Sequence, residues 1–159
     1  MKKMLLDCVS DSEYKLIGIN ASVEAYKLVY LTNSILKTKF KRTKNDIELI
    51  YNGFQINFSL FSYIDIKTHC KLYFIQNKSK YIDQNPNFVG SLFNFEEQQV
   101  NKYLLNSHKQ CDYFIKIEDE FDTFKIKKIL HDLNDIPQII SAYEINTSQI
   151  RDSKHLIFE

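Results

Sequence analysis

Residues 47–58 read IELIYNGFQINF, and this stretch predicts a β-hairpin around which the rest of the fold is arranged. Asn52-Gly53 supplies the positive φ angles that both central residues of a type I′ turn require. With the turn at this point, three apolar pairs face each other across the hairpin: Ile47 with Phe58, Leu49 with Ile56, and Tyr51 with Phe54. All six fall on one face of the pleat, and Ile50 alone breaks the pattern. Turn chemistry and apolar alternation therefore predict the same register.

Four further segments have strand composition, rich in β-branched and aromatic residues: 14–20, 70–77, 112–118 and 138–145. Apolar residues at helical spacing predict one helix at about 22–36 and another at about 122–134. Ser22 is the expected N-cap of the first helix. The second is expected to begin among carboxylates that its dipole would stabilise, namely Glu118, Asp119, Glu120 and Asp122.

The chain has 159 residues, which predicts a single domain over residues 1–159. The fold class we expect is α+β, with a mostly antiparallel sheet, two helices on one face and a C-terminal strand–helix–strand unit. A right-handed crossover would make the two strands of that unit parallel. Residues 79–99 are expected to be a polar loop within the domain, pinned to it by Phe88, Phe93 and Phe95.

Two finer expectations concern the uncovered side of the sheet and the C-terminus. Gln55, Asn57 and Ser59 would be costly to bury unpaired, so the face without helices is expected to be partly polar. Residues 156–158 read LIF and would add a short last strand or remain a loose end.

Composition narrows the class of protein. Twenty-one Lys and Arg oppose 20 Asp and Glu, which excludes a strongly basic nucleic-acid domain and an acidic tail. The apolar run near the N-terminus stops at Asp7, too early for a signal peptide, and no stretch approaches a transmembrane helix. Three widely spaced cysteines, Cys8, Cys70 and Cys111, suit a reducing compartment. We therefore expect a cytoplasmic protein.

Residues 103–105 read YLL and residues 112–118 read DYFIKIE. Together with residues 30–33 (YLTN), 90–93 (GSLF) and 136–143 (IPQIISAY), they give the chain a resemblance to the IPExxxVDY family of uncharacterised Bacteroidota proteins, over nearly its whole length. The family motif would fall on Leu105 to Tyr113, where Asp112 and Tyr113 match. Residues 105–107 read LNS in place of Ile-Pro-Glu, and Cys111 replaces Val. The family carries no established activity, so the resemblance implies a lineage and no mechanism.

A metal site and a catalytic site are both weakly indicated. His69, Cys70, His108 and Cys111 have the ligand count of a zinc site without its spacing, so we expect the two cysteines in the core. A Cys111 nucleophile paired with His108 or His131 is disfavoured, because an apolar strand position does not ionise a thiol. Glu96-Glu97 is most simply a solvated pair. The sequence therefore predicts no catalytic residue, no metal and no cofactor.

Partner binding rests on the basic segment 37–44, where Lys39, Lys41, Arg42 and Lys44 are the candidate partner-facing residues. The competing interpretation is an edge strand, because lysines at an edge prevent unwanted strand pairing. A second basic group occupies the outer face of the second helix, at Lys125, Lys127 and Lys128. Only two arginines are present, which disfavours sequence-specific recognition of DNA.

These observations favour a non-catalytic cytoplasmic interaction or accessory protein with a protein partner. The alternative is an RNA- or ribonucleoprotein-associated factor that uses the 37–44 segment. A small-molecule-binding or enzymatic domain ranks third, and no membrane partner is expected.

Overall fold

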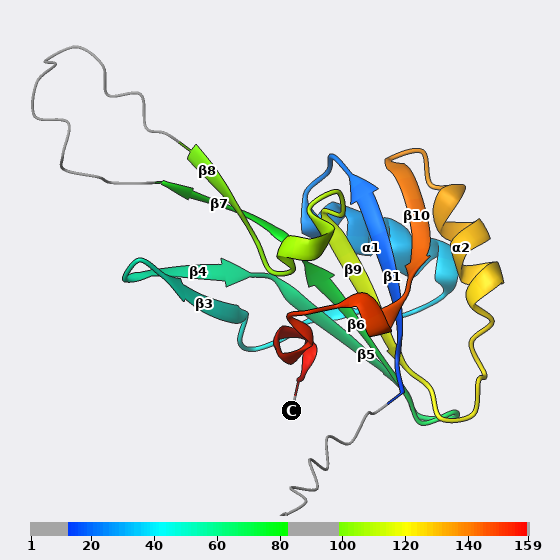
Figure 1. The fold of residues 1–159 in the computed structure, drawn as a ribbon. Helices are drawn as coiled ribbons and strands as arrows, with labels where there is room; N and C mark the ends of the chain where they lie inside the picture. Colours follow the sequence, from blue (N-terminus) through cyan, green and yellow to red (C-terminus); the bar gives the residue numbers. More distant parts are fainter. Residues whose placement is uncertain (1–12, 83–98, 159) are drawn as a thin grey trace, which may run out of the picture.

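A six-stranded antiparallel sheet organises the residues that the computed structural model describes, 13–82 and 99–158 (Figure 1). Its strands lie in the order β10–β1–β9–β6–β5–β2. Their bounds are β1 Lys15–Ala21, β2 Lys41–Arg42, β5 Leu60–Asp65, β6 Cys70–Gln76, β9 Tyr113–Glu118 and β10 Ile139–Ile145. The α+β class and the mostly antiparallel sheet are confirmed. The predicted strands at 14–20, 70–77, 112–118 and 138–145 match β1, β6, β9 and β10, whereas β5 was not predicted.

The strand–helix–strand unit at the C-terminus is split by β1. That central strand pairs antiparallel with both β9 and β10, so Gly18 faces Phe114 on one side and Tyr143 on the other. The strands β9 and β10 are therefore parallel, as predicted, but do not pair with each other.

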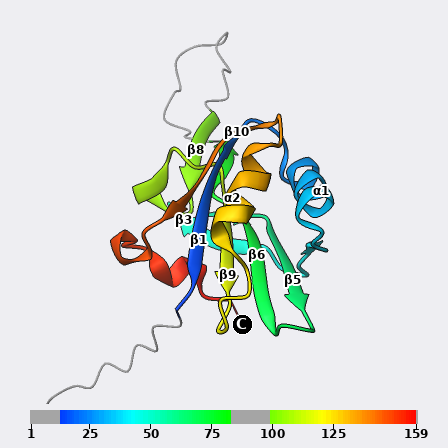
Figure 2. The same cartoon turned by 90° about the vertical axis from the view of Figure 1, so that its right-hand side faces the viewer.

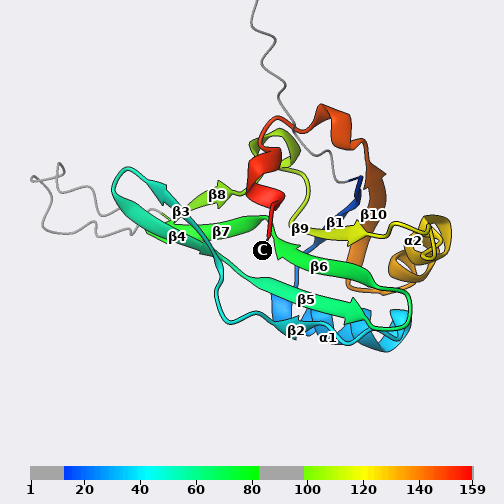
Figure 3. The same ribbon diagram turned by 90° about the horizontal axis from the view of Figure 1, so that it is seen from below.

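Both helices cover one face of the sheet (Figure 3). Helix α1 is Ala25–Leu36 and helix α2 is Ile126–Asn134. They bury Leu28, Val29, Ile129 and Leu133 against strand residues such as Phe74 and Ile115. Neither described helix has the length and apolar character that a membrane crossing requires.

Both helices begin later than predicted. Glu24, without a side-chain bond, is the residue before α1, so the Ser22 cap is wrong. Helix α2 has no carboxylate in its first turn, so its dipole does not explain the acidic cluster. Asp119 instead accepts hydrogen bonds from the backbone N–H groups of Phe121 and Phe124, at 3.3 and 2.7 Å. Asp119 therefore stabilises the loop that precedes the helix.

The predicted hairpin forms with the predicted register. Strands β3 (Ile47–Tyr51) and β4 (Phe54–Phe58) pair Ile47 with Phe58 and Tyr51 with Phe54. Asn52 and Gly53 have φ angles of 50° and 81°, as a type I′ turn requires. The hairpin is, however, a separate two-stranded sheet that leaves the main one.

The predicted polar loop at 79–99 is wrong at both ends. Strands β7 (Lys78–Ile82) and β8 (Gln99–Tyr103) pair there as a second hairpin, because Tyr81 and Val100 face each other and give the ribbon one apolar side. Phe88, Phe93, Phe95 and the pair Glu96-Glu97 lie outside the described residues.

The sheet face opposite the helices is a second core, so the prediction of a partly polar face is wrong. The 3₁₀ turns η1 (Asn106–His108), η2 (Thr147–Gln149) and η3 (Ser153–Leu156) cover it, together with the base of the β3–β4 hairpin. Gln55 and Asn57 are exposed because they sit on the hairpin after it has left the sheet. The C-terminal segment is neither strand nor loose end, since Leu156 is fully buried in this second core.

Candidate interaction surfaces

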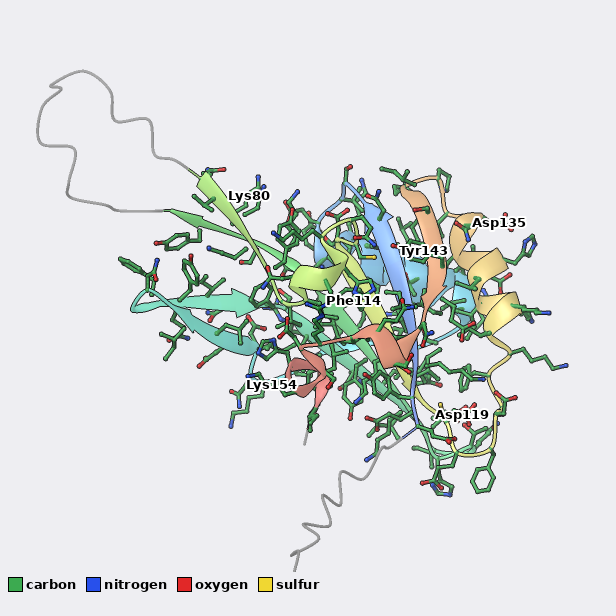
Figure 4. All side chains as sticks on the ribbon, in the orientation of Figure 1. Lys80, Phe114, Asp119, Asp135, Tyr143 and Lys154 are labelled. Atoms are coloured by element: carbon green, nitrogen blue, oxygen red, sulfur yellow. The ribbon has the colours of Figure 1, made fainter. Side chains whose placement is uncertain are left out.

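Two hairpins project from the body side by side and form what we call the arm, residues 47–58, 78–82 and 99–103 (Figure 1). An aromatic contact joins them, because the Phe54 and Tyr81 rings lie 5.5 Å apart. Lys102 reinforces the contact, with its Nζ 3.3 Å from the centre of the Tyr51 ring. Figure 4 shows side chains along the whole length of both hairpins, with Lys80 toward the outer end of the second.

The root of the arm is a buried asparagine. Asn77 links β6 to β7 and is fully buried. Its Nδ2 donates to the carbonyls of Cys111 and His108, at 2.7 and 3.0 Å, and its Oδ1 accepts from the Leu105 N–H at 2.8 Å. Its backbone also bonds to Leu104 and Asp112. A fully bonded buried amide holds a fixed geometry, so the arm leaves the body from a rigid base.

The tip of the arm is apolar and open. Ile50 is 81% exposed, and Tyr51 and Phe54, which face each other across the turn, are also exposed. Ile50 lies on the opposite face of the ribbon from Tyr51 and Phe54, so the tip exposes large apolar side chains on both faces. Exposed apolar side chains of this size are typical of a contact surface.

The predicted basic segment lies at the opposite edge of the main sheet from β10. Lys41 and Arg42 form the edge strand β2, paired with β5. The Arg42 guanidinium forms a bidentate ion pair with Asp46, with N–O distances of 2.7 to 3.0 Å, and lies over the Phe61 ring. Lys39 and Lys44 are exposed. The four residues are therefore close in space, but the one arginine already has a carboxylate partner.

Asp112 and Tyr113, the two positions shared with the family motif, hold the corner between β1 and α1. The Asp112 carboxylate accepts from the Ala21 N–H at 3.0 Å, and the Tyr113 hydroxyl donates to the Val23 carbonyl at 2.5 Å. Burial raises the pKa of Tyr113 to about 12. These contacts give both residues a structural role.

The cysteines and histidines do not come together as a zinc site. Cys70 lies in the core under the helices, and Cys111 lies in the core on the other face. Within the described ranges, no three His, Cys, Asp or Glu side chains are grouped as metal ligands would be. Burial raises the pKa of Cys70 to about 12 and also raises that of Cys111, whose Sγ lies 3.1 Å from the Tyr143 hydroxyl. Both thiols are therefore protonated at neutral pH.

Lys116 is an unusual core residue that sequence reasoning missed. It points into the second core, where its Nζ donates to Glu118 at 2.6 Å and to the Leu156 carbonyl at 2.7 Å. The rings of Tyr14, Tyr73 and Phe158 surround it within 5.7 Å. Its hydrogen bond to the Leu156 carbonyl and its contact with the Phe158 ring anchor the C-terminal segment to the sheet.

Sequence reasoning also missed two exposed tyrosines on α1. Tyr26 and Tyr30 are 71% and 70% exposed on the face away from the sheet. Their spacing of four residues, opposite the apolar positions of the helix, was the signal that pointed to them.

No family model, curated protein or solved structure matches this chain, so its resemblance to the IPExxxVDY family stays a prediction.

Proposed function

We propose that the chain is a non-catalytic interaction protein of the cytoplasm, which docks a partner protein on the tip of its arm. The observation that carries the proposal is the exposure of Ile50 at the end of a projecting hairpin, next to Tyr51 and Phe54. Aromatic side chains with an aliphatic neighbour are the usual anchors of a protein contact.

The rigid root supports this proposal. Asn77 fixes where the arm leaves the body, and the Phe54–Tyr81 contact fixes the two hairpins against each other. A surface that is already ordered loses little conformational entropy when it binds. A few side chains bury a small area, so we expect a transient complex rather than a permanent one.

A protein partner suits the tip better than RNA does. The residues at the end of the first hairpin are apolar or uncharged from Leu49 to Asn57, and the nearby Lys102 ammonium is engaged with the Tyr51 ring. In the basic segment Arg42 is paired with Asp46, and the edge position of β2 accounts for Lys41 without a partner.

The test replaces Ile50 by Asp and uses Ile66→Asp as a matched control. Ile66 is equally exposed, at 82%, but lies in the turn between β5 and β6 and outside the arm. Endogenous partner protein is recovered by affinity purification, with and without ribonuclease. We expect Ile50→Asp to lose the partner and Ile66→Asp to retain it. Ribonuclease treatment should change neither result. Equal recovery by the two variants would refute a docking role for the tip.

A further inference from the structure

The outer face of α1 has an aromatic and basic stripe. Tyr26, Tyr30, Ser34 and Lys37 follow one another at spacings of four, four and three residues, and all are exposed. Such spacing places side chains along one line on a helix. The stripe extends about 16 Å, at about 1.5 Å for each residue. Two tyrosines this exposed on a helix that buries its other face are not explained by the fold.

The charge around the stripe has one sign. Residues 25–45 contain six Lys and Arg and no Asp or Glu, although the whole chain is nearly neutral. Lys27, Lys37, Lys39 and Lys41 are all exposed. Figure 2 shows α1 on the same side of the molecule as β5, and Figure 3 shows β2, the partner of β5 that carries Lys41, next to α1. Lysines and two highly exposed tyrosines therefore occur together on this part of the described surface.

The loop that carries two of these lysines is held firmly in place. The Asn33 side chain accepts from the Phe40 N–H at 2.8 Å and from the Thr38 hydroxyl at 3.0 Å, and donates to the Phe40 carbonyl at 3.1 Å. Thr38 and Phe40 are buried, and Lys37 and Lys39, which alternate with them, are exposed. The lysines are therefore displayed from a fixed backbone next to the end of the tyrosine stripe.

We propose that this surface binds single-stranded nucleic acid. Tyr26 and Tyr30 stack on unpaired bases. The ammonium groups of Lys27, Lys37 and Lys39 contact the phosphates. Proteins that bind single strands without sequence preference combine aromatic platforms with a basic track of this kind.

The chemistry of the surface favours this ligand over a protein. Between the tyrosines the exposed helix residues are Lys27 and, further on, Ser34, with no exposed aliphatic side chain in the stripe. An aromatic ring offers a base its flat face, whereas a protein contact of ordinary strength needs an apolar centre. The surface is also separate from the arm, so the inference does not depend on the proposed function.

The stacking part is tested with fluorescently labelled oligo(U) and oligo(dT) of about 12 nucleotides, by anisotropy at about 50 mM salt. The double variant Tyr26→Ala/Tyr30→Ala should weaken binding about tenfold or more, since each stacked base contributes that much in single-strand binders. Phe121→Ala is the control, because Phe121 is 74% exposed and lies on the loop before α2. The two oligomers separate RNA from DNA as the ligand.

The electrostatic part uses two matched triple variants. Lys27, Lys37 and Lys39 are changed to Gln in one, and Lys125, Lys127 and Lys128, which are exposed at α2, in the other. The first should reduce the slope of log affinity against log salt by about 2, at about 0.7 for each phosphate contact to a single strand. The second should leave the slope unchanged.

Several outcomes would overturn the proposal. They are no binding of either oligomer by the wild-type chain, equal losses in the two triple variants, or duplex that binds as tightly as single strands. The proposal would also fail if the tyrosine variant lost a partner protein in ribonuclease-treated extract while its affinity for both oligomers stayed unchanged. Circular dichroism of each variant excludes misfolding. Ile50→Asp should keep full oligomer affinity, so failure here and failure of the arm proposal are distinguishable.

Discussion

The root and the tip of the arm differ in how they use their residues. At the root, Asn77 is fully buried and its amide bonds three backbone groups. At the tip, Ile50 is mostly exposed and a Cβ on Gly53 would touch nothing within 4 Å. The buried hydrogen bonds that stabilise the arm are therefore at its root, whereas side chains at the tip can be replaced with less loss of packing. Four predictions test this difference, in order of decreasing effect on stability.

Asn77→Leu should have the largest effect. It leaves the buried Leu105 N–H and Cys111 carbonyl without the partner that Asn77 gives them, whereas the His108 carbonyl still accepts from the Cys111 N–H. Each unsatisfied group costs about 1–3 kcal/mol, so for two groups we expect a loss of at least about 2 kcal/mol in urea denaturation. Asn57→Leu, at an exposed position of the arm, should change stability by no more than about 0.5 kcal/mol. Similar losses in the two variants would contradict the importance of the root.

Gly18→Ala should destabilise the body next to the root. A Cβ there would lie 2.5 Å from the Cys111 Sγ and 2.8 Å from the Ile145 Cδ1. Overpacking of this kind costs about 1–3 kcal/mol, measured as a lower melting temperature. The double variant Gly18→Ala/Cys111→Ala removes the sulfur and should recover part of that loss. Strictly additive losses would show that Cys111 is not the obstacle.

Gly53→Val should cost about 1–2 kcal/mol, because a β-branched residue resists a φ of 81°. No packing term adds to this, since the space around the position is empty. Gly53→Asn is the control, because Asn tolerates positive φ and should retain most of the stability. An unchanged melting temperature for the valine variant would contradict the turn geometry.

Alkaline pH should destabilise the body through Cys70. In the unfolded chain this thiol ionises near pH 9, whereas burial raises its folded pKa to about 12. Between these values the unfolded state holds fewer protons, so stability falls as pH rises, by at most about 1.4 kcal/mol per pH unit for this group. By pH 10 the loss relative to neutral pH should be about 1.4 kcal/mol in urea denaturation. Cys70→Ala should flatten the decline; an equally steep decline in that variant would assign it to other groups.

Local sequence signals predicted elements better than they predicted where those elements pack. Asn52-Gly53 and the alternation around it were sufficient for the hairpin and its register, because turn geometry is a short-range property. That the hairpin leaves the main sheet depends on contacts with Tyr81 and Lys102, more than 20 residues away in sequence. The second core was missed for the same reason, since turns and tail segments such as η3 have no periodicity that would predict their burial.

The candidate surfaces were predicted only in part. Lys39, Lys41, Arg42 and Lys44 do lie together, as their closeness in sequence requires, but the pairing of Arg42 with Asp46 depends on the bend between them. Ile50 stood out in the sequence as the break in an otherwise regular alternation. Its exposure at the end of a projecting hairpin depends on the tertiary arrangement, which the alternation alone does not predict.

The central position of β1 has a consequence for the protein while it is being synthesised. This strand is made before its partners, since Ile17 pairs with Ile115 and Glu144, which emerge from the ribosome about 100 and 125 residues later. Until then its apolar run, Leu16 to Ile19, has no strand to pair with. Nascent chains with such an unpaired strand are prone to aggregate and depend on chaperones. Slowing translation between β1 and β10, through residues 106–145, should therefore reduce the yield of folded protein more than slowing it through the residues that precede β1.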